Sequence, residues 1–215
     1  MNYLELVNDV LVRLREDEVS SVSENSYSKM IGKFVIDAQR QVEDAYNWNS
    51  LSNTLTMDTV ASLFNGVLVG SGQRFRVLNV INDTSNWFMN YKSSNEMDDL
   101  FLNQGAEQGA PMYYNFNGFS SQGDTQVDIY PIPNGVYTIR FNIIQPQDPL
   151  RFDADELLVP AEPVIFLAYS KAIAERGEDA GFASSEAYAL YRQSLADHIA
   201  IEANRYPDET IWDAA

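Results

Sequence analysis

The feature that most constrains the fold is a double change in the spacing of apolar residues along the chain. Up to Trp48, apolar side chains recur every three or four residues, which is the repeat of an amphipathic helix. From Asn49 to about Pro149 they tend to alternate with polar residues, and from Pro160 the helical spacing returns. The sequence therefore predicts helices at both ends of the chain and a β region between them.

The longest helical pattern runs from Ser23 to Trp48, with apolar residues on one face and most charged residues on the other. Either Ser23 or Asn25 can cap its N-terminus, because both short side chains accept hydrogen bonds from first-turn amides. Gly32 lowers the helix propensity by about 1 kcal/mol relative to alanine and indicates close packing or a local weakness. A shorter amphipathic helix over residues 3–16 precedes this one, and the two are expected to form a helical hairpin.

Two further helices are expected in the C-terminal part of the chain. Pro163 suits a first helical turn, and Gly177 suits the left-handed conformation that often ends a helix. The last helix is predicted from an N-cap at Ser184 or Ser185 to about Tyr206. Neither terminal pair can form a stable core alone, so we expect all four helices to pack together.

The first part of the β region is expected to contain a hairpin and a short helix. Residues 74–81 and 87–91 have the composition of strands, and residues 82–86 between them have that of a turn. A helix is expected to follow from Ser94 to Leu102, where apolar residues return to a spacing of three and four.

A second hairpin has the clearer signal. Residues 125–130 and 137–143 both alternate apolar and polar side chains. Between them Asn134 and Gly135 form a pair that tolerates the positive φ angles of a tight hairpin turn. We therefore expect these two segments to be neighbouring antiparallel strands.

These patterns predict an α+β fold with two domains. Two N-terminal and two C-terminal helices form a four-helix bundle, and a mainly antiparallel β domain is inserted between the second and third helices. The discontinuous helical domain is expected over residues 1–50 plus 155–215, and the inserted β domain over residues 51–154.

The charge balance limits the partners. Fourteen basic residues against 31 acidic ones give a net charge of −17, which argues against a phosphate-gripping groove and against attraction to anionic lipid. No apolar run approaches the roughly 18 residues that span a bilayer, and the N-terminus lacks the pattern of a signal peptide. We expect a protein made in a cytoplasm, with no membrane partner and no tightly bound nucleic acid.

Catalytic and metal-binding signals are weak. The chain has no cysteine and one histidine, His198, which we expect to be a packing or edge residue rather than a ligand. The carboxylates of Asp153–Glu156 lack the glycine and distal glutamate of a calcium loop, so a solvated turn is expected there. The glycine-rich Val69–Gln73 lacks the lysine of a phosphate-binding loop, and neighbours such as Asp98 and Asp99 arise by chance among 31 acidic residues. We predict no catalytic residue, cofactor or metal site, and hence no enzyme.

Five stretches carry a resemblance that covers nearly the whole chain. In order they are MNYLELVNDVLVRLREDEVSSV, DAYNW, RFRVLNVIND, DTQVDIYPIPNGVYTIRFNIIQP and AIAERGEDAGFASSEAYALYRQSLAD. They resemble the head-to-tail adaptor (connector) proteins of tailed bacteriophages, in particular the tail tubular protein A type of short-tailed phages. The resemblance implies a structural virion protein at the head–tail junction, assembled in the host cytoplasm.

The same resemblance implies the partners. A homo-oligomeric ring, expected to be a dodecamer, would sit under the portal protein and above a downstream tail or nozzle protein. DNA would pass through its lumen during ejection without tight binding. The C-terminal segment in such proteins reaches the portal, which here implies an interface with the portal or a neighbouring subunit at Tyr206, Pro207, Ile211 and Trp212. The alternative is that Ile211 and Trp212 fold back onto the protein's own helices.

An aromatic run in the β region offers a second candidate interface. Runs such as Tyr113, Tyr114, Phe116 and Phe119 are commonly half core and half interface, so we expect a contact with a tail component here. The same rings could stack on sugars, and the alternative function is a carbohydrate- or receptor-binding β module of a phage tail. A hydrolase with paired carboxylates is a third class, and it would require a cleft with two facing carboxylates.

Overall fold

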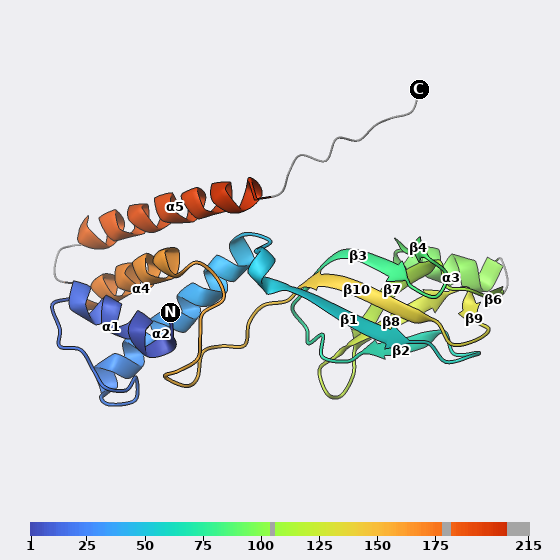
Figure 1. The fold of residues 1–215 in the computed structure, drawn as a ribbon, viewed down its shortest axis with the longest axis horizontal. Helices are drawn as coiled ribbons and strands as arrows, with labels where there is room; N and C mark the ends of the chain where they lie inside the picture. The colour runs from blue at the N-terminus through green and yellow to red at the C-terminus, as the bar shows by residue number, and fades with distance from the viewer. Residues whose placement is uncertain (104–105, 178–181, 206–215) are drawn as a thin grey trace, which may run out of the picture. The chain divides into compact units, whose positions relative to one another are not determined.

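The computed structural model describes residues 1–103, 106–177 and 182–205 (Figure 1). Its contacts divide the chain into a helical unit, Met1–Leu51 with Pro146–Ala215, and a β unit, Ser52–Gln145. The β domain was predicted over residues 51–154, whereas the division places the chain from Pro146 onward in the helical unit. There the buried Gln39 donates from Nε2 to the carbonyl oxygen of Asp148 at 3.3 Å, which ties this segment to a helix.

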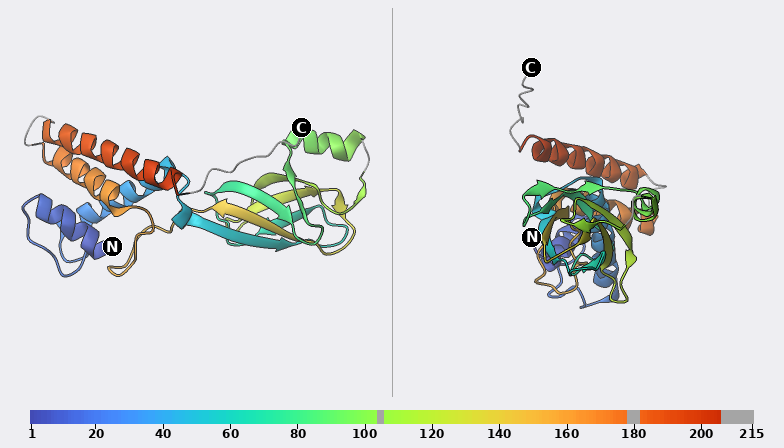
Figure 2. Two further views of the ribbon diagram at one scale, coloured as in Figure 1. Left: turned by 45° about the horizontal axis from the view of Figure 1, so that its top comes forward. Right: turned by 90° about the vertical axis from the view of Figure 1, so that its right-hand side faces the viewer.

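The described residues of the helical unit form four α-helices, α1 (Tyr3–Arg13), α2 (Ser26–Ala45), α4 (Ala161–Arg176) and α5 (Phe182–Ala203), and one short 3-10 helix, η1 (Asn49–Leu51). Helix α4 contacts each of the other three, and the pair α4 and α5 lie side by side in both figures (Figures 1 and 2). The mixed α+β class and the antiparallel sheets are therefore observed. That these helices form a regular four-helix bundle stays a prediction.

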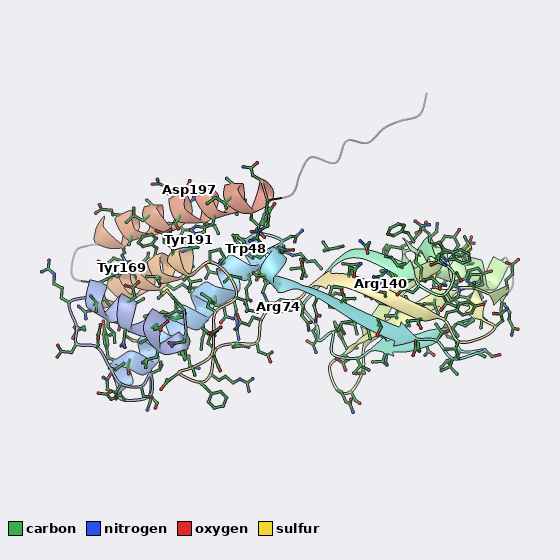
Figure 3. All side chains as sticks on the ribbon, viewed as in Figure 1. Trp48, Arg74, Arg140, Tyr169, Tyr191 and Asp197 are labelled. Atoms are coloured by element: carbon green, nitrogen blue, oxygen red, sulfur yellow. The ribbon has the colours of Figure 1, made fainter. Side chains whose placement is uncertain are left out.

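Local side-chain hydrogen bonds define the ends of α2. Asn25, rather than Ser23, is the N-cap, because its Oδ1 accepts from the amide of Ser28 at 2.8 Å while the Ser28 hydroxyl accepts from the Asn25 amide. At the other end the indole Nε1 of the buried Trp48 donates to the carbonyl oxygen of Val42 at 2.7 Å (Figure 3). This bond satisfies one of the carbonyls that the end of a helix leaves unpaired.

The two C-terminal helices agree with prediction at one boundary and differ at another. Gly177 caps α4 in the left-handed conformation, as its sequence position predicted. The N-cap predicted at Ser184 or Ser185 is wrong, since α5 already begins at Phe182. Ser184 is held inside the helix, where its carbonyl oxygen accepts from the hydroxyl of Ser170 of α4 at 3.0 Å. Further along α5, Tyr191 is buried on the side of the helix that faces α4 (Figure 3).

In the part of the β unit that the structure describes, the strands form two four-stranded sheets and one short two-stranded sheet. The first sheet has the order β1 (Ser52–Asp58), β10 (Thr138–Ile144), β3 (Arg76–Asn82) and β4 (Trp87–Phe88). The second has the order β2 (Asn65–Leu68), β8 (Thr125–Tyr130), β7 (Tyr113–Phe119) and β5 (Asn90–Tyr91). The short sheet pairs β6 (Gln108–Gly109) with β9 (Ile132–Pro133). All pairs are antiparallel except β5 with β7 and β6 with β9.

The two large sheets share one hydrophobic core. Its buried residues come from both sheets and from the residue between β4 and β5, namely Met57, Leu68, Val80, Met89, Tyr114, Val127, Ile129, Ile139, Phe141 and Ile143. The sheets therefore pack face to face as a sandwich (Figure 2). The predicted helix in this region is observed as α3 (Ser94–Asn103).

The hairpin predicted from Asn134 and Gly135 is wrong. β8 pairs with β2 and β7, whereas β10 pairs with β1 and β3, so the two segments lie in different sheets. The reason is their burial pattern, because Val127 of β8 and Phe141 of β10 fill the same core from opposite sides. These side chains are buried equally well whether the two strands lie in facing sheets or side by side in one sheet. Residue alternation alone therefore does not distinguish the two arrangements.

The hairpin predicted over residues 74–91 is correct only in its first half. β4 pairs with β3 as expected, with Phe88 opposite Ile81. At the buried Met89 the chain crosses to the other sheet, where Asn90 and Tyr91 run parallel to β7. One buried side chain thus divides the expected strand into two short strands that serve different sheets.

Candidate functional site

The aromatic run of β7 divides between the two faces of its strand. The ring of Tyr114 is buried between the sheets and lies edge-on to Phe141, with 6.0 Å between ring centroids. Tyr113 faces the other way, and the Nζ of Lys92 lies 5.5 Å from its ring centroid. On this outer face Asn115 donates to the hydroxyl of Ser94 in α3 at 3.1 Å. Tyr114 is thus a core residue, and part of the outer face is covered by α3.

Phe116 and Phe119 line a groove of about 430 Å³ in the β unit, which we call the aromatic groove. Its other aromatic walls are Phe75, Tyr91 and Tyr114. The rings of Phe75 and Phe116 are T-shaped, with 5.6 Å between their centroids. The pairing register of β7 shifts between Phe116 and Phe119, where Gly118 takes a φ of +76°. This bulge allows both phenylalanines to line one groove. Phe119 remains 52% exposed and Tyr91 55%, so the groove presents apolar surface to solvent.

The C-terminal candidates Tyr206, Pro207, Ile211 and Trp212 lie outside the described residues. Their role as an interface stays a prediction.

The glycine-rich loop at residues 69–73 binds a carboxylate of its own chain. Oδ1 of Asp124 accepts from the amides of Gly70 at 3.0 Å and Gly72 at 3.3 Å. The hydroxyl of the buried Ser71 accepts from the amide of Thr125 at 2.9 Å. The amides that would hold a phosphate are occupied by Asp124, so the loop is a structural turn.

The acidic segment Asp153–Glu156 does more than form the solvated turn that its sequence predicted. Oδ1 of Asp153 accepts from the amide of Val22 at 3.1 Å, which anchors the loop between α1 and α2. The amides of Phe152 and Arg151 donate to Asp155 and hold the pKa of its carboxyl below the ordinary value. These bonds use the carboxylates to fix the backbone.

Two further titratable groups, His198 and Asp128, have structural surroundings. His198 is half-buried, with its Nδ1 2.8 Å from the carbonyl oxygen of Ser194 and 3.9 Å from a carboxylate oxygen of Glu162. Burial raises the pKa of the Asp128 carboxyl, a hydrogen bond of 2.9 Å from Asn117 opposes the rise, and the negative charge of Asp98 adds to it. Across the ranges that the structure describes, no group of three histidine or acidic side chains could hold a metal ion.

A second groove, of about 620 Å³, lies in the helical unit and was missed by sequence reasoning. We call it the basic groove, because four of the chain's 14 basic residues line it, namely Lys29, Lys33 and Arg40 of α2 and Arg151 of the loop before α4. Ile36 and Phe152 add apolar surface, and Phe152 is 72% exposed. The spacing of the three α2 residues was a usable signal, since positions four and seven apart share one side of a helix.

In the parts of the chain that are described, no helix has the length and apolarity required to cross a membrane. A search of the curated proteins finds no match. The family model of the SU10 adaptor protein matches residues 1–210, which is nearly the whole chain. Proteins of this kind are structural components of the phage virion at the head–tail junction. The chain therefore belongs to the SU10 adaptor protein family of bacteriophages.

Proposed function

We propose that the protein forms a homo-oligomeric ring, a dodecamer, between the portal protein and a downstream tail or nozzle protein, with DNA passing through its lumen. The observation that carries the adaptor role is the family match over residues 1–210. A ring is the expected geometry for a part that continues a channel. Head-to-tail contacts between identical subunits form a closed ring when the rotations from one subunit to the next add up to a full turn. The finer assignment to the tail tubular protein A type stays a prediction.

Exposed apolar residues on the helical unit support self-association. On α5, Tyr188, Leu190 and Ile201 are 47%, 44% and 68% exposed. Leu190 and Ile201 are eleven residues apart, which places them on the same flank of the helix three turns apart. Large apolar side chains repeated along one flank are typical of a surface that a partner covers.

The aromatic groove is the proposed contact for the tail component. Phe116 and Phe119 contribute accessible aromatic surface, as does Tyr91 from the edge strand β5. Aromatic side chains are enriched among the residues that dominate binding energy at interfaces. The C-terminal segment from Tyr206 is proposed to contact the portal or a neighbouring subunit.

The net charge of −17 supports passage of DNA without retention. A wall that is acidic or neutral gains little from counterion release, so phosphates are not held in place. We propose such a wall for the lumen. Tight, salt-sensitive binding of duplex DNA by the isolated protein would contradict this part of the proposal.

The deciding experiment is a mass measurement of the purified protein, alone and mixed with portal-bearing heads, combined with electron microscopy of the particles. The proposal expects rings, or ring formation on the heads, with no catalytic turnover. A Phe119→Asp variant should still form rings and join the heads, yet it should fail to recruit the downstream tail component. A protein that stays monomeric in both settings would overturn the ring.

One observation favours a second candidate function. The aromatic groove also contains Gln73 and Thr125, and aromatic rings beside polar side chains suit the binding of a sugar. Glycan binding by a monomer that is abolished in Phe119→Asp would support the carbohydrate-binding alternative. The adaptor proposal expects no such binding.

A further inference from the structure

The basic groove is unusual in a chain that carries a net charge of −17. Its lining includes four basic side chains and one carboxylate, that of Asp153. The Asp153 carboxylate already accepts the Val22 amide, so its position is fixed at the wall of the groove. Basic side chains therefore outnumber acidic ones in the groove by four to one, with apolar surface beside them, and the groove suits an acidic ligand with apolar anchors.

The groove opens along the side of α2 that is opposite its fully buried residues. Helix α4 contacts both α2 and α5. The C-terminal end of α5 reaches the residues just after α2, where a carboxylate oxygen of Glu202 accepts from the amide of Asn49 at 2.9 Å. The α2 residues that are fully buried, such as Ile31, Val35 and Val42, fall on a different side of the helix from Lys29, Lys33 and Arg40. In Figures 1 and 2, α5 lies at one side of this unit and the loop that carries Arg151 at the other.

The chain itself contains a ligand of the required chemistry. Residues 207–215, PDETIWDAA, have three acidic residues, Asp208, Glu209 and Asp213, and no basic residue. Their two large apolar residues, Ile211 and Trp212, stand between the acidic ones. Both the charges and the apolar anchors therefore have counterparts in the basic groove.

The lengths also agree. The stripe from Lys29 to Arg40 spans eleven residue-to-residue steps along the helix, or about 17 Å at 1.5 Å per step. Nine extended residues span up to about 30 Å, so this segment is long enough to follow the whole stripe. A segment of one copy that binds a different surface of the next copy makes a head-to-tail contact, and such contacts generate rings or open filaments.

We propose that the acidic segment 207–215 of one copy binds in the basic groove of a second copy, with Ile211 and Trp212 against Ile36 and Phe152. Lys29, Lys33, Arg40 and Arg151 pair with the acidic residues of the segment. This inference rests on the proposed ring, and it assigns one of that ring's intersubunit contacts.

The first test uses charge reversal. Lys29→Glu combined with Lys33→Glu should weaken self-association at least tenfold at about 0.15 M salt, because the variant repels the segment. Asp208→Lys combined with Glu209→Lys should weaken it similarly, and a mixture of the two variants should regain association. The matched control, Arg15→Glu with Lys171→Glu, makes the same charge change outside both the groove and α5 and should associate normally. Rings that are unchanged by the reversal in the groove would overturn this inference while leaving the proposed ring intact.

The second test distinguishes a second copy from the same copy. Because the natural chain has no cysteine, Lys33→Cys and Ile211→Cys can be introduced separately into two copies of different mass. Oxidation of the mixture should give a disulfide-linked heterodimer in high yield. With both cysteines in one chain, a product that stays monomeric at all protein concentrations would show a tail folded onto its own groove, and it would overturn the inference.

The same variants distinguish two other possible ligands of the basic groove, a portal segment and DNA. If the groove reversal leaves the ring unchanged but abolishes attachment to portal-bearing heads, the occupant is a portal segment and the inference is wrong. If the wild-type protein binds a 20-base-pair DNA duplex and the reversal abolishes that binding, the groove holds phosphates instead. A protein that forms no ring alone or on heads would defeat the proposed function itself, which is a different outcome from each of these.

Discussion

Nε of Arg176, in the last turn of α4, donates a hydrogen bond of 2.8 Å to the hydroxyl of Tyr27 in the first turn of α2. The guanidinium also lies over the same ring, 5.2 Å from its centroid. Its remaining nitrogens reach the carbonyl oxygen of Leu14 and the carboxylate of Glu16, just after α1. One side chain therefore connects three segments of the helical unit that are far apart in sequence.

Replacing Arg176 should destabilise the helical unit. Arg176→Ala removes several hydrogen bonds to a charged donor, and we expect the free energy of unfolding to fall by about 2 kcal/mol. Tyr27→Phe keeps the ring under the guanidinium and should cost about 1 kcal/mol. Urea denaturation followed by circular dichroism measures both. Arg205→Ala is the control. Its side chain is 56% exposed, Glu202 keeps its hydrogen bond from the Asn49 amide, and the free energy should change by less than about 0.5 kcal/mol.

Gly32 is required by close packing inside the helical hairpin. A Cβ added there would lie 2.8 Å from Cγ1 of Val22 and would meet the hydroxyl of Tyr3. We expect Gly32→Ala to lower the free energy of unfolding by about 1–3 kcal/mol, although alanine favours the helix. Thermal denaturation should also show that adding Tyr3→Phe recovers part of the loss. Gly135→Ala, where the space is open, is the control, and a loss there as large as at Gly32 would remove packing as the explanation.

The parts of the fold that sequence predicted well are those set by neighbouring residues. Asn25 as a helix cap and Gly177 as a left-handed terminus depend on side chains within four residues of the helix end. The pairing of β8 and β10 depends instead on which surfaces meet in the core. Residue alternation fixes which face of a strand is buried and leaves open which strand lies beside it.

The residues of the two grooves also divide into those that the sequence pattern indicated and those that only the fold brings together. The aromatic run in β7 indicates that some of its residues are core, yet it does not show that the bulge at Gly118 brings Phe116 and Phe119 to one groove. The stripe of Lys29, Lys33 and Arg40 is visible in the helical repeat. Arg151, more than a hundred residues later, joins it only because the loop before α4 returns to α2.

The N-terminus of α3 should respond to acid. The amide of Ser93 donates to Glu96, Lys92 and the Ser93 hydroxyl donate to it as well, and these bonds lower the pKa of Glu96 to about 2. Because the folded pKa is below the ordinary value of 4.5, the stabilisation is complete above pH 4.5 and is lost as the pH falls towards 2. NMR titration of the Glu96 carboxyl should give a midpoint near 2 in the folded protein. A midpoint near 4.5 would show that the three donors do not hold the carboxylate.

The contact of Asp124 with the glycine-rich loop should stabilise the β unit. Its carboxylate accepts the amides of Gly70 and Gly72, and Asp124→Ala would leave both amides to water or unpaired. We expect the free energy of unfolding to fall by about 1–3 kcal/mol, with faster hydrogen exchange at these two amides. Asp124→Asn keeps an acceptor oxygen without the charge, so it should lose less. Glu107→Ala, which removes an exposed acidic side chain of the β unit, is a control for the change in net charge. If Asp124→Ala leaves exchange at Gly70 and Gly72 unchanged, the loop is held by Ser71 and Thr125 rather than by the carboxylate.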